Sequence, residues 1–85
     1  KVVLRVYGVH VEYIRSLPLH SSQEEIKTSD GEYSDFLYWL CLTPELITKI
    51  LSMGEKVEVL EPDILKKEVL KRLFNTINRY LNYQI

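Results

Sequence analysis

Hydrophobic and polar positions alternate along residues 1–7, and this pattern predicts a β-strand. One face of this strand is aliphatic: Val2, Leu4 and Val6. Gly8 ends the alternation, and apolar residues then recur at near-helical spacing over residues 9–17. Pro18 ends this short helix, because proline disfavours helical geometry at the residue before it.

Two further strands are predicted around a tight turn. Residues 22–29 are polar with one apolar position, which is typical of an edge strand whose charges discourage wrong pairing. Asp30-Gly31 is a hairpin signal, since both residues tolerate positive φ. Residues 32–43 are apolar on both faces, which predicts a central strand that is covered twice. One face carries Phe36, Tyr38, Leu40 and Leu42; the other carries Leu37, Trp39 and Cys41.

The second half of the sequence predicts a helix, a strand and a longer helix. Thr43-Pro44 is a favourable helix start, and Gly54 is a typical residue just past a helix end. Residues 56–62 form the fourth strand, and a last helix of about twenty residues begins at Pro62-Asp63. Its apolar stripe is formed by Leu65, Val69, Leu73, Ile77 and Tyr80, widened by Leu70, Phe74 and Leu81.

The order of elements is therefore β-α-β-β-α-β-α, which predicts an α+β fold on the ferredoxin-like plan. The sheet should be antiparallel and four-stranded. Its expected buried residues are Val2, Leu4, Val6, Phe36, Leu40, Val57 and Val59. The last helix is an addition to that plan, and at about 1.5 Å per residue it reaches roughly 30 Å. We expect it to cover the open sheet face, a partner, or both.

Composition predicts one small globular domain over residues 1–85. Because the sequence has no initiator Met and Lys1 leads directly into a strand, we expect this domain to be a fragment of a longer chain. The sequence is 46% hydrophobic and 27% charged, which excludes a disordered tail. Cys41 is the single cysteine, so a disulfide framework and a Cys-rich metal site are excluded. No apolar run approaches the roughly 20 residues that span a bilayer. We therefore expect a cytoplasmic protein with no membrane contact.

Charge is divided unevenly along the chain. Residues 1–62 carry six Lys/Arg against ten Asp/Glu, whereas residues 63–85 carry five against two. The basic end is typical of a solvated helix face, and an anionic partner is the alternative.

The stretch LPLHSSQEEI, residues 17–26, gathers polar side chains without forming a catalytic set. His20, Ser21 and Ser22 are neighbours in sequence, whereas a nucleophile and its base usually come from distant positions and are held by a third group. No metal-ligand spacing and no phosphate or dinucleotide loop is present. We expect no enzyme activity, no metal and no cofactor.

Nucleic acid or a small anion is the alternative ligand class. Ferredoxin-like domains of the RNA-recognition type stack bases on aromatic residues of their central strands. The sequence lacks the Lys/Arg-Gly-aromatic pattern of those sheets, so core or interface roles for its aromatics are favoured. The candidate contacts under this alternative are Arg5, Tyr7, His20 and Gln23.

The amino-acid sequences of the loops resemble those of one protein family. PLHSSQ (18–23), then a hairpin, then WLCLTPELITKILSMGEKVEVLEPDILKKEVLKRL (39–73) is similar to the C-terminal extension of WYL-domain proteins, called WCX. That family has a PLHxSQ loop, a turn matched here by Ser52-Met53-Gly54, a strand matched by Val57 to Pro62, and a tyrosine matched by Tyr80. Gly8 departs from the family, whose members often carry a polar helix cap there.

The resemblance implies a regulatory module. Full-length relatives resemble bacterial transcription regulators with an N-terminal winged helix-turn-helix, a WYL barrel and this extension. The Trp-Tyr-Leu triplet belongs to the barrel, so Trp39 is not its counterpart. The implied roles are dimerisation and response to an effector, such as a nucleotide or nucleic acid, with DNA bound elsewhere in the full-length protein.

Self-association, or contact with the upstream barrel, is the expected use of the surplus apolar surface. Exposed apolar patches of more than a few hundred Å² usually mark interfaces. The expected interface residues are Leu37, Trp39, Phe74, Ile77, Tyr80, Leu81 and Tyr83.

Overall fold

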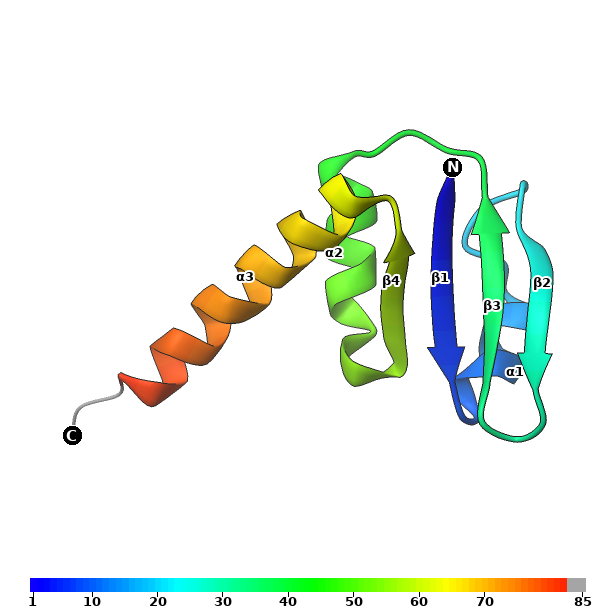
Figure 1. The fold of residues 1–85 in the computed structure, drawn as a ribbon, viewed down its shortest axis with the longest axis horizontal. Coiled ribbons are helices and arrows are strands. Elements are labelled where there is room, and N and C mark those ends of the chain that lie inside the picture. The colour runs from blue at the N-terminus through cyan, green and yellow to red at the C-terminus, as the bar shows by residue number, and fades with distance from the viewer. Residues whose placement is uncertain (83–85) are drawn as a thin grey trace.

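The computed structural model describes residues 1–82 and contains three α-helices and four strands (Figure 1). In chain order the elements are β1 (Val2–Tyr7), α1 (His10–Ser16), β2 (Glu24–Ser29), β3 (Tyr33–Tyr38), α2 (Pro44–Ser52), the 3₁₀ turn η1 (Gly54–Lys56), β4 (Val57–Glu61) and α3 (Asp63–Leu81). The predicted order of strands and helices and the α+β class are confirmed.

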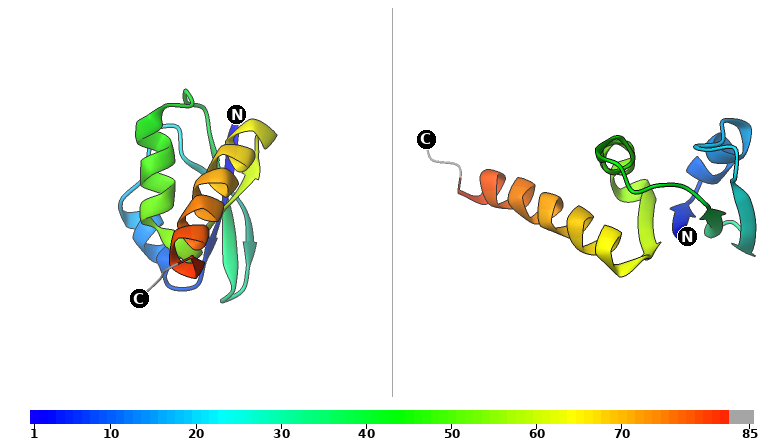
Figure 2. Two further views of the ribbon diagram at one scale, coloured as in Figure 1. Left: turned by 90° about the vertical axis from the view of Figure 1, so that its left-hand side faces the viewer. Right: turned by 90° about the horizontal axis from the view of Figure 1, so that it is seen from above.

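The four strands form one antiparallel sheet in the order β2-β3-β1-β4. The predicted four-stranded antiparallel sheet and the edge position of β2 are therefore confirmed. Figure 2 shows α1 and α2 on one side of the sheet. The other side, which faces the viewer in Figure 1, has no helix over it and is called the open face below.

Local sequence signals account for the element ends. The Thr43 hydroxyl accepts a hydrogen bond from the Leu46 backbone N–H at 3.2 Å, and Pro44 occupies the first helical position of α2. Gly31 takes a φ of 72° in the β2–β3 turn, a conformation that favours glycine. The Glu32 N–H then donates to the Ser29 carbonyl at 3.0 Å and closes the hairpin.

The core lies between the sheet and helices α1 and α2. The residues that were expected there and are buried are Val2, Leu4, Val6, Phe36, Val57 and Val59. Leu40 is only partly buried and packs at the edge of this core. Ile14 from α1 and Ile50 from α2 complete the helical side of the core.

The prediction of a long third strand covered on both faces is wrong. β3 ends at Tyr38, because β1 begins at Val2, the residue paired with Tyr38, and supplies no backbone partner beyond it. The backbone N–H of Trp39 bonds instead to the Ser22 hydroxyl at 2.9 Å. Residues 39–42 run as an irregular connection, and the Leu37 side of β3 lies on the open face.

α3 does not cover the open face of its own sheet, so that part of the expectation is wrong, whereas contact with a partner stays a prediction. Its buried residues are Leu65 and Val69, in the first two turns, where the helix packs against β4 and α2. Beyond Val69 the helix projects away from the body of the molecule (Figures 1 and 2). The domain measures 45 × 28 × 20 Å as a result.

Candidate interaction surface

The loop from Pro18 to Gln23 joins three parts of the fold through one amide side chain. The Gln23 Oε1 accepts hydrogen bonds from the Leu19 N–H at 3.1 Å and from the Tyr38 hydroxyl at 2.6 Å. Its Nε2 donates to the Ile14 carbonyl at 3.0 Å, near the end of α1. Gln23 therefore links α1, its own loop and β3, and its polar atoms are occupied within the chain.

Ser22 and His20 are also engaged in backbone contacts. The Ser22 hydroxyl accepts a hydrogen bond from the Trp39 N–H and lies 3.2 Å from the Trp39 carbonyl oxygen. It therefore bonds both backbone groups of the residue that follows β3. The His20 Nδ1 accepts from the Ser22 N–H at 3.1 Å and lies 2.7 Å from the Ser22 hydroxyl. The histidine and serine therefore contact each other in an arrangement that satisfies backbone groups.

The open face carries a self-neutralised polar cluster. The Arg5 guanidinium donates to both carboxylate oxygens of Asp35, at 2.8 and 3.0 Å, and lies 4.0 Å from the centre of the Tyr33 ring. The Tyr7 hydroxyl donates to Glu58 at 2.5 Å. The bond to Asp35 raises the pKa of Arg5, and the bond to Glu58 raises the pKa of Tyr7. Arg5 is thus a paired cation and not a free anion-binding group.

The four candidate ligand contacts lie in two separate places. Arg5 and Tyr7 lie on the open face of the sheet. Gln23 is bonded to Ile14 on the helical side, and His20 lines a cleft on that side. The structure therefore does not bring the four residues together into one site.

The cleft lies between α2 and the loop that follows α1, over the helical side of the sheet, and has a volume of about 550 Å³. Small-molecule sites commonly have volumes of this size. Its lining residues are Val2, Leu4, Leu19, His20, Tyr38, Leu40, Cys41, Thr43, Glu45, Leu46 and Lys49. The floor is apolar, and one acidic and one basic side chain, Glu45 and Lys49, lie among the α2 residues of the lining.

A second polar cluster ties α1 to β2. Arg15 on α1 binds both carboxylate oxygens of Glu25, at 2.9 and 2.6 Å, and also contacts Glu12. The Thr28 hydroxyl donates to the same Glu25 carboxylate at 2.8 Å, and the buried Ser34 hydroxyl contacts it too. The hydrogen bond from Arg15 holds the pKa of Glu25 at about 2. No spacing in the sequence signalled this link, because its partners are ten residues apart on different elements.

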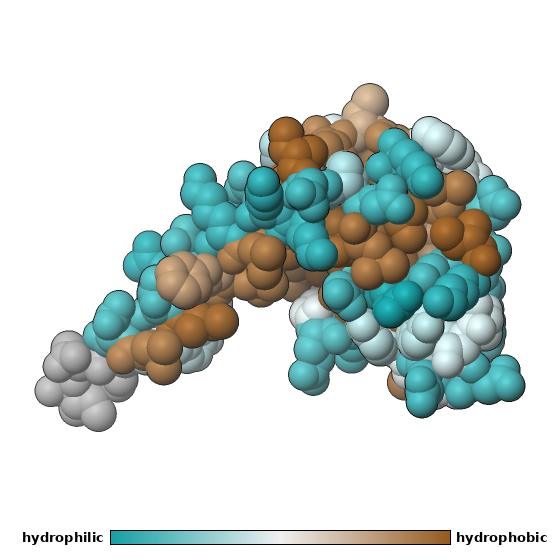
Figure 3. All heavy atoms as spheres, viewed as in Figure 1, coloured by the Kyte–Doolittle hydropathy of each residue, from teal (hydrophilic) through white to brown (hydrophobic). Residues whose placement is uncertain are grey.

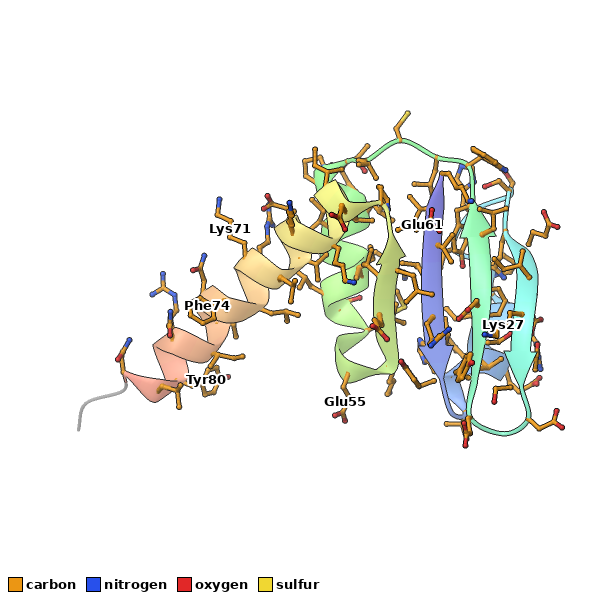
Figure 4. The ribbon with its side chains drawn as sticks, viewed as in Figure 1. Lys27, Glu55, Glu61, Lys71, Phe74 and Tyr80 are labelled. Carbon is orange, nitrogen blue, oxygen red and sulfur yellow. The ribbon has the colours of Figure 1, made fainter. Side chains whose placement is uncertain are left out.

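Six exposed apolar side chains form a stripe on α3. Its side chains are 41 to 80% exposed and recur every three or four residues: Leu70, Leu73, Phe74, Ile77, Tyr80 and Leu81, here called the α3 stripe. In Figure 3 brown hydrophobic side chains form a band along this helix below a teal edge. Lys71 and Tyr80 lie on opposite sides of α3 in Figure 4. The helix is therefore amphipathic with its apolar side unpartnered in the described structure.

The expected interface residues fall into two groups. Phe74, Ile77, Tyr80 and Leu81 belong to the α3 stripe. Leu37 lies half-buried on the open face, and Trp39 is 60% exposed just beyond the end of β3. Tyr83 lies outside the described residues. Leu70 and Leu73 were predicted as members of the apolar stripe but not as interface residues, and they are 56% and 41% exposed.

The described part of the chain offers no metal site and no membrane span. Among residues 1–82 no three His, Cys, Asp or Glu side chains are grouped so that they could hold a metal ion. Within the same range no helix is both long and apolar enough to cross a bilayer. The surface features considered for function are the cleft, the open face and the α3 stripe.

The comparison with protein families decides the family. A family model described as WCX domain matches residues 1–75. The chain belongs to the WCX domain family. The match spans the sheet, α1, α2 and most of α3, and it ends within the α3 stripe. Membership supports the reading of this WCX domain as a C-terminal module of WYL-type regulators. A search of curated proteins finds no match.

Proposed function

We propose that this WCX domain is the self-association and effector-response module of a bacterial transcription regulator. The observation that carries the proposal is the α3 stripe, six large apolar side chains in a row that are left without a partner in the described chain. Amphipathic helices normally bury such a stripe. A second copy is the default partner, since most soluble oligomers are symmetric assemblies of one chain.

The size of the stripe supports a protein partner. If on the order of 100 Å² of each large side chain is available to a partner, the stripe offers about 600 Å² per copy. A standard interface buries roughly 800 Å² per partner. The stripe is thus large enough to be the main part of an interface, and some further surface is needed to complete it.

The remaining parts of the proposal rest on the family. DNA binding is assigned to an N-terminal winged helix-turn-helix and effector recognition to the assembled regulator in the cytoplasm. The cleft of about 550 Å³ has a size that suits a small effector, and its floor is apolar. We assign the sheet order β2-β3-β1-β4 to the ferredoxin-like plan, since it has β1 and β3 at the centre.

We propose a non-catalytic domain. The support is that the His20–Ser22 pair satisfies backbone groups of its own loop and of residue 39, and that Arg5 is neutralised by Asp35. Direct binding of nucleic acid or of a small anion has little support among residues 1–82, because Arg5 is paired with Asp35 and Lys27 lies at the edge strand, 5.8 Å from the centre of the Tyr33 ring.

Sedimentation equilibrium over rising protein concentration tests self-association. We expect a reversible dimer, and we expect Phe74→Ala and Leu81→Ala each to raise its dissociation constant about tenfold, because truncating a buried interface side chain costs about 1 to 2 kcal/mol. Asn75→Ala is the matched control on the opposite side of α3 and should leave the constant unchanged. A strict monomer at hundreds of micromolar, with both stripe variants silent, would overturn the proposal.

A further inference from the structure

We propose that each α3 stripe packs on the open sheet face of a second copy, so that two chains exchange their C-terminal helices about a two-fold axis. This inference rests on the proposed self-association and names the surface that receives the helix. It also extends past the family match, because that match ends at residue 75 whereas Ile77, Tyr80 and Leu81 continue the stripe.

The helix cannot reach its own sheet. α3 begins at the β4 edge, and its last buried residue is Val69. The twelve residues from there to Leu81 extend the helix by about 18 Å as a rigid rod. Figure 2 shows this rod leaving the body on the side of α2 that lies away from α1. At that distance the stripe lies beyond the reach of the described sheet of its own domain, and a second copy is the occupant proposed for it.

The open face is the surface that lacks a layer. A sheet normally buries at least one face against a helix or another sheet, and here α1 and α2 cover only one face. Val3, Leu37 and Leu60 form an apolar band on the open face, placed there by the β1–β3 register and by the alternation along β4. Leu37 and Leu60 are half-buried and Val3 is 4% exposed, so the two leucines provide most of the surface that a partner could contact. In Figure 3 brown side chains on this part of the sheet adjoin the brown band of α3. The two surfaces thus face the same side of the molecule.

Two-fold symmetry then lets each copy use both surfaces at once. A copy turned over onto the open face would lay its α3 across the sheet and receive the other α3 on its own sheet. This arrangement buries the stripe and the apolar band of each chain. Pairing the two α3 helices with each other would bury only the stripe, about 600 Å² per copy, and would leave the sheet bare.

Charge favours the exchange as well. The segment 63–85 carries five Lys/Arg against two Asp/Glu, whereas residues 1–62 carry ten acidic against six basic side chains. Glu24, Glu58 and Lys27 lie on the open face beside the neutral Arg5–Asp35 pair, so these side chains have a net negative charge. Packing α3 on the sheet brings opposite net charges together, whereas packing α3 on α3 brings two basic segments together.

Disulfide trapping tests the exchange in the chain with Cys41→Ser, which removes the native thiol. Leu37→Cys on the sheet is combined in turn with Phe74→Cys, Ile77→Cys or Leu81→Cys on the stripe. Under oxidised glutathione we expect at least one pair to give a reducible dimer in more than half of the chains, with the linkage between the two engineered cysteines found by peptide mass mapping. Leu37→Cys with Asn75→Cys, on the opposite side of α3, should give several-fold less.

Each outcome separates the exchange from the underlying association. A dimer in sedimentation that yields no sheet-to-helix linkage in any of the three pairs would overturn the exchange and leave the proposed self-association standing. Efficient dimers from the single stripe variants alone would show α3–α3 pairing, which also overturns it. A strict monomer would overturn the proposed function and the exchange together.

Discussion

At the scale of single residues, the loop that carries the family resemblance is explained by hydrogen bonds. In PLHSSQ the histidine, the second serine and the glutamine each satisfy backbone groups that the core does not reach. Buried polar groups of the backbone must be paired, and a loop without regular structure needs side chains to pair them. In sequence this motif looks like a reactive cluster. In the fold its side chains form hydrogen bonds that hold the loop in place.

Gln23→Ala tests this role of the loop. The Tyr38 hydroxyl, on a residue that is 1% exposed, would lose its acceptor, and the Ile14 carbonyl and Leu19 N–H would lose partners. We expect the free energy of unfolding to fall by about 2 kcal/mol in urea denaturation. Ser21→Ala, an exposed position in the same loop, should change it by less than about 0.5 kcal/mol. Equal stability of the two variants would refute the structural role of Gln23.

Acid stability should report the Arg15–Glu25 pair. The pKa of Glu25 falls from 4.5 to about 2 on folding, chiefly through its hydrogen bond with Arg15. Because the folded state holds the proton less tightly than the unfolded state, the contribution to stability is complete above pH 4.5 and is lost as the pH falls toward 2. Thermal melts from pH 7 to 2 should therefore decline less steeply for Glu25→Gln than for the wild type. Glu24→Gln should keep the wild-type slope, and equal slopes for all three proteins would contradict the assignment.

At the scale of elements, α3 is one helix with two different surroundings. Its first two turns bury Leu65 and Val69 against β4 and α2, and the remaining turns carry an equally apolar stripe into solvent. An isolated amphipathic helix is only marginally stable in water, so most of its stability comes from packing. The outer turns of α3 are thus the part of the fold that has most to gain from a partner.

Replacing leucine by alanine should lower the free energy of unfolding by different amounts at two positions of α3. Leu65 is 1% exposed and Leu81 is 76% exposed. In dilute protein, where the chain is monomeric, Leu65→Ala should lower the free energy of unfolding by about 2 to 5 kcal/mol because it opens a cavity. Leu81→Ala should change it by less than about 0.5 kcal/mol. Chemical denaturation at low micromolar concentration measures both, and a large loss for Leu81→Ala there would mean that the outer turns pack within the monomer.

At the scale of the whole molecule, the domain leaves two of its surfaces uncovered, one sheet face and the outer part of α3. Its sheet is covered on one face, its last helix projects beyond the body, and its two charge-segregated parts are separated in space. A chain of 85 residues buries only about 60% of the surface that it exposes when unfolded, so a second molecule adds an appreciable share of the total burial. Association and stability should therefore be coupled in this domain.

The sequence by itself determined the elements, their order and the family. Alternation in β1 and β4, the Asp30-Gly31 turn, and the Thr43-Pro44 cap are local signals, because each depends on the geometry of a few neighbouring residues. The resemblance to the WCX family was visible in the sequences of the loops. The candidate interface residues on α3 were likewise visible as a helical stripe.

Only the tertiary structure decided where β3 ends and what its second face meets. A strand stops where its neighbour offers no further backbone partner, and the start of β1 opposite Tyr38 is not visible from the apolar run 36–42. The apolar stripe of α3 likewise does not show where burial within the chain ends. Whether an apolar side chain is core or surface depends on the direction in which its helix leaves the sheet, and that direction is set at β4 by packing against α2, so Leu65 is buried and Ile77 is not.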